Sequence, residues 1–379
     1  MDVAERTRDL VSIPSHDGEA AAGDHIEAWL REHTDAAVTR DEAGADAGRG
    51  GNVVARKGSG DTSLAFVGHH DVVPPDDAQV TDDGGYVVRE ERVEGDSRLY
   101  GRGSADMKGA VAAAMCAFRD ANPGEGLELV FASFVGEEVG GIGARAAIDR
   151  GFAPDYAVVG EGSTGYSGPG VTDVAIAHKG RRGSTLVAAG SAAHASEVEA
   201  GDNAIYRASD AVDVVRDLQF PTTEVLGHDL SGSVAVTEIE GGSAWNVIPE
   251  RCAVTVDERT VPGERAPLAR VEEIEGITWT VDQDLPPMAC DEPDFADAVL
   301  SAARSAQESE DADAPGTGKP AQVVKPHATD AGWLAEAGTT CVICGPSEPG
   351  EAHTADESVS LAVLERCYEI YRTTAERWP

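Results

Sequence analysis

The sequence predicts an α/β domain with a mostly parallel central sheet, into which a smaller α+β domain is inserted. Over residues 1–172, helical patterns alternate with short apolar runs that end in glycine, which is typical of α/β domains. Over residues 173–287, alternating strands surround one helical pattern. Over residues 288–379 the chain returns to helix, strand and helix. We therefore assign 1–172 and 288–379 to the larger domain and 173–287 to the inserted one.

The larger domain opens with two helical patterns and continues with apolar strands. The expected helices cover 3–13, 24–34 and 107–121, and the expected strands cover 52–57, 63–68, 128–136, 156–160 and 339–345. The acidic stretch SAQESEDADAPGTGKPAQ, residues 305–322, contains glycine and proline and predicts an exposed loop.

The inserted domain has a different sequence pattern, because its expected strands alternate apolar and polar residues. The expected strands cover 174–180, 184–190, 233–242, 252–260 and 277–284, and the one expected helix covers 203–218. A segment of this length falls within the usual size range of an independent domain. The proline pair in DLPPMACDEPDF marks its end.

Charge is the most unusual feature of the composition. The 379 residues include 68 Asp and Glu against 30 Lys and Arg, which gives a formal net charge of −38. Phosphate binding needs the opposite sign, so we expect no nucleic-acid partner. Self-repulsion of this size is relieved when salt screens it. We therefore hypothesise a salt-rich cytoplasm, as in a halophile, and easier unfolding when salt is removed.

Neither membrane insertion nor a disulfide framework is expected. The longest apolar runs, such as LVFASFV, fall far short of the roughly 20 residues that span a bilayer. The segment MDVAERTRDLVSI lacks the features of a secretory signal, which makes the cytoplasm the default location. Six cysteines are scattered along the chain, and Cys341 and Cys344 lie in an apolar run that favours a buried strand over a redox or zinc motif.

The first side chains that could bind a metal or act in catalysis follow the end of the strand at 63–68. There, in GHHDVVP, His69 and Asp71 project to one side of an extended chain and His70 to the other. Asp71 could then accept a hydrogen bond from the ring of His69 and fix its tautomer for metal binding. Alone, such a pair is more often structural than a metal site.

Other strand ends carry metal-capable groups as well. The strand at 128–136 leads into Glu137 and Glu138, the strand at 156–160 into Glu161, and the strand at 339–345 into the loop with His353. Ligands collect at the carboxyl ends of strands in open parallel sheets. Asp106 adds a carboxylate at an expected helix start, where it could cap the helix, bridge metals or do both.

This set of imidazole and carboxylate groups suits zinc or a related first-row metal. Two metals about 3.5 to 4 Å apart could share Asp106 and a water of lowered pKa. One carboxylate of the Glu137 and Glu138 pair would then be free to act as a general base.

These residues resemble the M20 family of metallopeptidases and deacylases, which includes acetylornithine deacetylase, succinyl-diaminopimelate desuccinylase, aminoacylase and glutamate carboxypeptidase. The similarity extends over nearly the whole chain, through LVSIPS, GHHDVVP, GRGSADMKG, FVGEEVGG, VVGEGS and AHTADESV. It implies a zinc-exopeptidase-like catalytic domain and an inserted lid and dimerisation domain.

The resemblance also implies a role for each residue of the site. One zinc would be held by His69 and Glu161, the other by Glu138 and His353, with Asp106 bridging both. Asp71 would orient His69. Glu137 would take a proton from the bridging water as the resulting hydroxide attacks the amide carbonyl, and would pass it to the leaving amine.

Three residues of the inserted domain receive roles from the same resemblance. In AAHASEVEAGDNAI, His194 would reach the active site of the partner subunit of a homodimer and stabilise the oxyanion. Asn246 in WNVIPERC would lie near the scissile carbonyl, and Arg259 in VDERTVPG would bind a substrate carboxylate. By residue type alone, all three could instead serve a turn or a surface ion pair.

The implied activity is hydrolysis of an N-acyl amino acid, such as an acetylated or succinylated basic amino acid, with two Zn²⁺ per chain and Co²⁺ or Mn²⁺ as substitutes. The main alternative is a carboxypeptidase or dipeptidase acting on small peptides, and a remote one is a non-catalytic relative that binds a metabolite. Two departures from the family pattern, GEGS and PHATDAG, leave the substrate open.

Overall fold

The computed structural model describes residues 3–308 and 318–379, which divide into two compact units. The larger unit contains residues up to Ala177, Ala289–Lys325 and Thr329–Pro379, and the smaller unit contains His178–Met288 with Pro326–Ala328. The assignment of catalytic and lid roles to separate domains stays a prediction.

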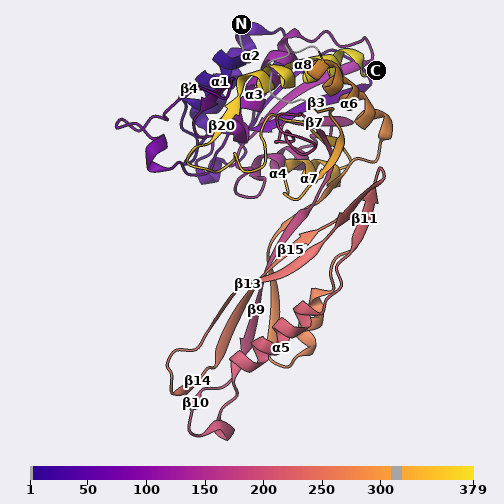
Figure 1. The fold of residues 1–379 in the computed structure, drawn as a ribbon. Helices are drawn as coiled ribbons and strands as arrows, with labels where there is room; N and C mark the ends of the chain where they lie inside the picture. Colours follow the sequence, from indigo (N-terminus) through magenta and orange to yellow (C-terminus); the bar gives the residue numbers. More distant parts are fainter. Residues whose placement is uncertain (1–2, 309–317) are drawn as a thin grey trace. The chain divides into compact units, whose positions relative to one another are not determined.

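A mixed sheet forms the centre of the larger unit (Figure 1). Along the path of the sheet the strands are β1 (Ala37–Arg40), β2 (Val53–Lys57), β6 (Leu127–Phe134), β3 (Thr62–His69), β7 (Tyr156–Val159), β19 (Thr340–Ile343), β8 (Val174–His178) and β17 (Met288–Ala289). Strand β18 (Gln322–Lys325) also pairs with β8. A separate three-stranded sheet joins β4 (Arg89–Val93), β5 (Asp96–Tyr100) and β20 (Ser358–Ser360).

The predicted α/β class is confirmed, and the four central strands β6, β3, β7 and β19 are parallel. Their residues are almost continuously buried and apolar, as expected of strands covered on both faces. The flanking pairs are antiparallel. One of these strands, β8, was expected in the inserted domain but belongs to the large sheet, because all five of its residues are buried and it pairs with β19.

Helices cover both faces of this sheet. Helices α3 and α8 pack on one side with α1 and α6, and α4 and α7 pack together on the other (Figure 1). The helices are α1 (Val3–Val11), α2 (Ala20–His33), α3 (Gly109–Asp120), α4 (Ile142–Asp149), α6 (Pro293–Glu308), α7 (Asp330–Glu336) and α8 (Leu361–Arg377). The loop expected over 305–322 begins inside α6, and its central residues 309–317 lie outside the described residues.

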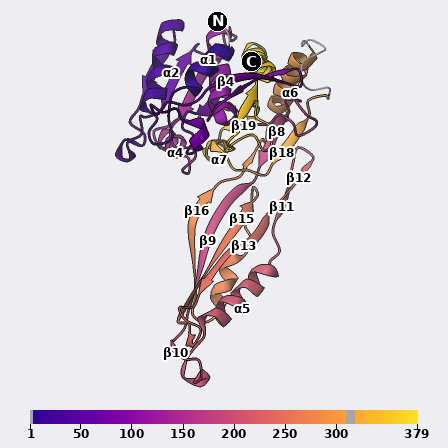
Figure 2. The same ribbon diagram turned by 60° about the vertical axis from the view of Figure 1, so that its left-hand side comes forward.

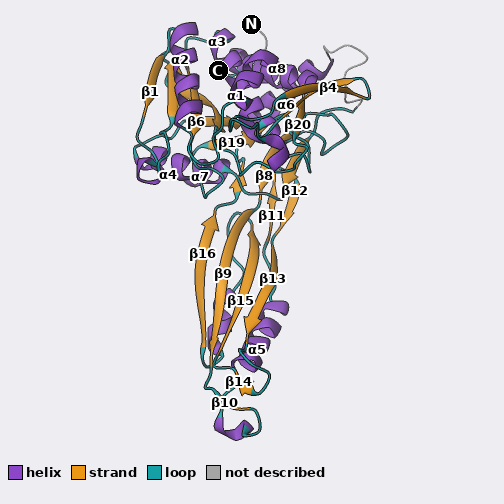
Figure 3. Ribbon diagram, turned by 90° about the vertical axis from the view of Figure 1, so that its left-hand side faces the viewer, coloured by secondary structure: helices purple, strands orange, loops and turns teal. Residues whose placement is uncertain are grey.

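The smaller unit is an antiparallel sheet with one long helix on its face (Figures 2 and 3). Its strands, in order, are β13 (Ser233–Gly241), β15 (Arg251–Thr260), β9 (Gly180–Ala189) and β16 (Ile277–Leu285). Helix α5 (Ala204–Arg216) is capped by Asn203, whose side chain accepts from the Ile205 N–H. The unit also contains a short antiparallel pair, β10 (Ala193–His194) with β14 (Val247–Ile248), and a hairpin, β11 (Thr222–Val225) with β12 (His228–Ser231).

Two further expectations can be compared with the fold. All six cysteines are free and buried, and Cys341 lies within β19 as the apolar run predicted. Among the described residues, no helix is long and apolar enough to cross a bilayer.

Candidate metal centre

His69, the last residue of the buried strand β3, lies at the middle of a cluster of carboxylates. Its Nδ1 lies 3.1 Å from the backbone oxygen of Asp71, which can only accept, so Nδ1 carries the proton. The opposite nitrogen, Nε2, lies 3.1 Å from Asp106 Oδ1 and 3.5 Å from Glu161 Oε1. The tautomer therefore presents a lone pair toward these carboxylates, as a metal ligand requires.

His70 points in the other direction. Its Nδ1 lies 2.8 Å from Ser133 Oγ on the neighbouring strand β6. Burial lowers the pKa of His70 to about 3, so this imidazole is neutral at physiological pH. The alternation of side chains predicted for GHHD therefore holds in the structure.

Asp106 does not cap a helix, contrary to one of the two readings of its position. Helix α3 begins at Gly109, and the preceding turn, Ser104–Lys108, has non-helical torsion angles at Asp106. No side chain caps the N-terminus of α3. Both oxygens of Asp106 face imidazoles instead, with Oδ1 3.1 Å from His69 Nε2 and Oδ2 3.1 Å from His353 Nε2. A carboxylate between two histidines has the geometry of a bridge.

The turn after β6 is held by Asp71. Its Oδ1 accepts from the Glu137 N–H and its Oδ2 from the Glu138 N–H, each at 3.1 Å. Its Oδ1 also lies 3.4 Å from His69 Nδ1. Asp71 thus positions both glutamates as well as contacting the histidine. The turn needs glycine at position 141, because φ is 72° there and an added Cβ would lie 2.8 Å from Asp330 Oδ1.

Glu138 and His353 meet at the far side of Asp106. His353 Nε2 lies 3.0 Å from Glu138 Oε1. His353 lies on an irregular loop with a positive φ of 64° and is half exposed, whereas Glu138 is largely covered. One imidazole and two carboxylates therefore converge from three separate segments of the chain.

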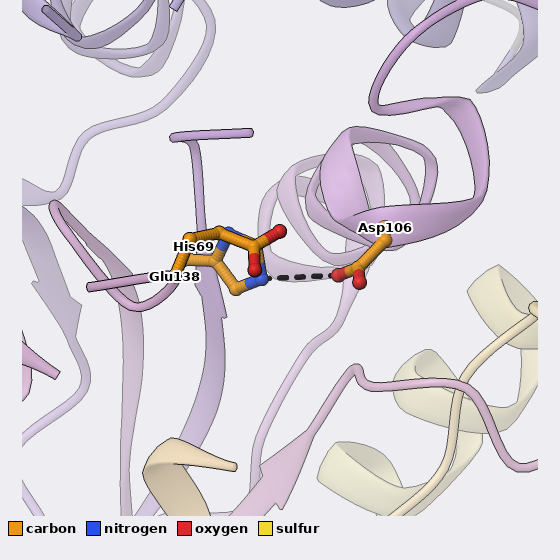
Figure 4. A group of neighbouring side chains, drawn as sticks. All are labelled: His69, Asp106 and Glu138. Atoms are coloured by element: carbon orange, nitrogen blue, oxygen red, sulfur yellow. Dashed lines mark hydrogen bonds and ion pairs between the residues drawn. The ribbon is translucent and has the colours of Figure 1, made fainter. Parts of the chain in front are cut away.

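Two overlapping groups share His69 and have the spacing of metal ligands. One group contains His69, Asp106 and Glu138, and the other contains His69, Glu137 and Glu161. In each group the donor atoms lie within 4.8 Å of one another. Figure 4 shows the first group, in which the imidazole of His69 faces the carboxylate of Asp106. The sequence placed His69, Glu137, Glu138 and Glu161 at strand ends on one edge of the sheet and Asp106 at a helix start, and the structure brings these residues together.

The electrostatics of the cluster favour a cation. Burial, then the neighbouring carboxylate of Glu161, raise the pKa of Glu137 well above its usual range. Hydrogen bonds with Asp106 and Glu138 raise the pKa of His353 to about 10. Negative charge that holds a proton on an imidazole also stabilises a divalent ion, which competes with that proton for the same nitrogen. The donor set, with imidazole and carboxylate and without thiolate, fits zinc or a related first-row metal.

Three residues near the cluster were not identified from the sequence. Glu357 is buried, and its Oε1 accepts from the N–H groups of Ala105 and Asp106, which fixes the backbone that carries the bridging carboxylate. Asp330 has both oxygens buried without a hydrogen-bond partner, and burial raises its pKa to about 7. Lys325 is also buried there. Glu357 lies in the segment AHTADESV, Asp330 lies in PHATDAG, and Lys325 directly precedes PHATDAG. Their residue types alone do not reveal that they are buried.

Of the three candidates of the smaller unit, His194 and Asn246 lie on neighbouring segments, because His194 pairs with Val247, and Arg259 lies apart from both. His194 is exposed, and its Nδ1 accepts from the Ser196 N–H at 3.2 Å. Asn246 is half-buried just before β14, and its backbone oxygen accepts from the Ala195 N–H. Arg259 is on β15, where its Nε donates to Asp257 Oδ1 at 2.7 Å. An ion pair was one of the readings left open for Arg259.

Comparisons with known proteins agree with the geometry. Residues 65–377 match Peptidase family M20/M25/M40. The chain is 32% identical over 339 residues to acetylornithine deacetylase of Myxococcus xanthus, covering 84% of this chain and 82% of the relative. It is 31% identical over 402 residues to succinyl-diaminopimelate desuccinylase of Rhodospirillum centenum, covering 98% and 96%.

The fold is also that of a solved aminopeptidase, PepT of Bacillus cereus, with a TM-score of 0.76 and 18% identity over 98% of this chain and 96% of that one. The family match spans well over half of the chain. The acetylornithine deacetylase and the succinyl-diaminopimelate desuccinylase named above each align with most of the chain. The chain therefore belongs to Peptidase family M20/M25/M40 and is a metal-dependent amidohydrolase.

Proposed function

We propose that this chain hydrolyses the amide bond of N-acyl amino acids with two zinc ions per chain. The observation that carries the proposal is the pair of overlapping ligand groups around His69. The two curated relatives are named for removal of acetyl or succinyl groups from amino acids. We assign one ion to His69 and Glu161, the other to Glu138 and His353, and the bridge to Asp106.

The ions would supply Lewis acidity, which lowers the pKa of a water and polarises the substrate carbonyl. Glu137 supplies the proton transfers. Its carboxylate lies within 4.8 Å of the ligand atoms of His69 and Glu161, so it is close enough to take a proton from a water in the site. Burial favours its protonated form, which suits the later delivery of that proton to the leaving amine.

A substrate panel tests the reaction class. N-acetyl and N-succinyl amino acids, dipeptides and carboxypeptidase substrates would be assayed in high salt with zinc, cobalt or manganese. We expect the highest kcat/KM on an N-acyl amino acid. Inactivity on every acyl amino acid, together with turnover of peptides, would favour the carboxypeptidase or dipeptidase alternative.

We further propose a homodimer through the smaller unit. Strand β13 is an edge strand of its sheet, which leaves one side of its backbone without a ladder partner among the described residues. Large apolar side chains on β13, on α5 and after β13 are exposed: Ile239 at 56%, Tyr206 at 69% and Trp245 at 96%. Large apolar side chains exposed near an unpaired strand edge are features of an association surface.

His194 is suited to bind an oxyanion. Because its Nδ1 accepts from the Ser196 N–H, the proton of the neutral ring lies on Nε2, which is free to donate. His194 lies near the end of the sheet at which Arg251 pairs with Ala189, and Arg259 lies at the other end, paired with Arg181. Eight residues of extended chain separate these ends by roughly 26 Å. If both side chains contact one substrate, they belong to different subunits.

Mixing two inactive variants tests this arrangement. We expect His194→Ala and Glu137→Gln each to be nearly inactive as homodimers. In a mixed dimer, the chain with intact Glu137 receives an intact His194 from its partner, so random reassociation should restore about one quarter of wild-type activity. Activity that stays at the level of the parents after subunit exchange would show that His194 acts within its own chain or not at all.

Stability should depend strongly on salt. With a net charge of −38, the folded chain repels itself, and unfolding separates the charges. Raising KCl from about 0.1 M to about 1 M shortens the screening length from about 10 Å to about 3 Å. We expect Tm to rise by about 10 °C over this range. An unchanged Tm in differential scanning calorimetry would contradict the proposed adaptation to high salt.

A further inference from the structure

Lys325 is the last residue of β18 and the only buried residue of that strand. The side chain has a relative exposure of 4% although its charged group usually remains in water. Burial lowers its pKa, and the carboxylates that oppose this effect are Glu161, Asp106 and Glu137. The ammonium group therefore belongs to the same electrostatic environment as the candidate metal centre.

Other buried cations of the larger unit are paired with protein groups. Lys108 donates to the backbone oxygen of Ile13 at 2.6 Å, and Arg102 forms an ion pair with Glu357. Lys325 forms neither a hydrogen bond nor an ion pair within 4.0 Å with any described residue. A largely desolvated ammonium group without a protein partner costs free energy, part of which a bound anion recovers.

Bound metals would reduce the negative charge that surrounds Lys325. The three proposed carboxylate ligands, Asp106, Glu138 and Glu161, carry three negative charges against the four positive charges of two divalent ions. No described residue pairs with the ammonium group, so its positive charge is available to attract an anionic group on the substrate.

We propose that Lys325 binds a second carboxylate of the substrate, beyond the one that the family resemblance assigns to Arg259. This inference rests on the proposed amide hydrolysis and narrows its substrate class. An N-acetyl amino acid with a neutral side chain has one carboxylate and leaves Lys325 without a partner. A second carboxylate comes either from a dicarboxylic acyl group or from an acidic side chain, and both would pair with the ammonium through a charge-assisted hydrogen bond.

Matched substrates separate these two sources. N-succinyl-L-alanine and N-butyryl-L-alanine differ in whether the acyl chain ends in a carboxylate or a methyl group. N-acetyl-L-glutamate and N-acetyl-L-glutamine differ in the charge of the side chain. For wild type we expect the charged member of one pair to have the higher kcat/KM, and the pair that shows this preference identifies the source.

The variant Lys325→Met removes the charge and keeps an unbranched side chain of similar length. We expect the charged-to-neutral ratio of kcat/KM to fall by about 30- to 100-fold, as for loss of a hydrogen bond between charged groups. Lys319→Met is the matched control, because Lys319 is exposed shortly before β18 and should leave the ratio unchanged. Circular dichroism checks folding, and Lys325→Gln provides a second neutral variant if Met is not tolerated.

Binding provides a readout without turnover. In the Glu137→Gln background with zinc bound, calorimetry should show that Lys325→Met weakens the Kd of the preferred charged substrate by about 30-fold. Equal losses on charged and neutral probes would overturn the assignment and leave Lys325 a structural role. If wild type hydrolyses none of the probes and the Glu137→Gln protein binds none, the proposed function fails and the assignment fails with it.

Discussion

Replacing Glu137 by Gln is expected to lower kcat by about 10³-fold while the protein keeps its metals, since positioned general bases contribute on the order of 10² to 10⁴. Gln has nearly the same shape as Glu but cannot accept a proton from water at neutral pH. The proposed ligands of both ions remain intact. Activity assays combined with metal analysis of the purified variant measure both effects.

This experiment distinguishes a base from a metal ligand, because Glu137 lies in one of the two ligand-like groups, with His69 and Glu161. If Glu137 binds metal, Glu137→Gln will lose about one ion per chain, and the assignment of the base will be wrong. Glu128→Gln is the matched control. Glu128 lies on β6, the strand that leads into this turn, and pairs with Arg56 at the surface. We expect it to retain both activity and metal.

Much of this site could be predicted from where apolar runs end. Parallel strands bring their carboxyl ends to one edge, so residues that follow separate strands converge even when they are far apart in sequence. His69, Glu138 and Glu161 follow this rule. The alternation of side chains in an extended segment also predicted the opposite directions of His69 and His70. Both rules depend only on local periodicity.

The rest of the site depends on contacts that have no local signature. The sequence left open whether Asp106 caps a helix, bridges metals or does both, and in the structure a buried glutamate from a distant segment, Glu357, holds its backbone outside the helix. Strand β8 looked like part of the inserted domain because it directly precedes that domain's strands. Its burial and its pairing with β19 place it in the large sheet. Contacts between segments that are distant in sequence therefore determine the positions of Asp106 and β8.

Asp71 has a larger role in the structure than the sequence predicted. The sequence assigned it to the orientation of one histidine. In the structure its two oxygens also accept from the successive N–H groups of Glu137 and Glu138. One buried carboxylate therefore couples the end of β3 to the turn after β6. The proposed base and one proposed ligand depend on it for their positions.

Asp71→Asn should therefore weaken zinc binding by about 10- to 100-fold and reduce activity at limiting zinc, as changes to groups that orient metal ligands do. Asn has one acceptor oxygen, so its amide group would face one of the two backbone N–H groups, which would be left buried and unsatisfied at a cost of about 1 to 3 kcal/mol. Competition with a zinc chelator measures the affinity, and thermal unfolding of the metal-free protein measures the stability.

Asp155→Asn is a matched control at the opposite end of β3, where Asp155 Oδ2 accepts from the Ser63 N–H at 2.8 Å. This bond has the same chemistry but lies at the exposed end of the strand, so its loss should leave zinc affinity unchanged. Equal zinc affinity in Asp71→Asn and wild type would show that the glutamate turn keeps its shape without Asp71. In that case the turn would be held by its own glycine-rich backbone, in which the Gly141 N–H donates to the oxygens of Gly136 and Glu137.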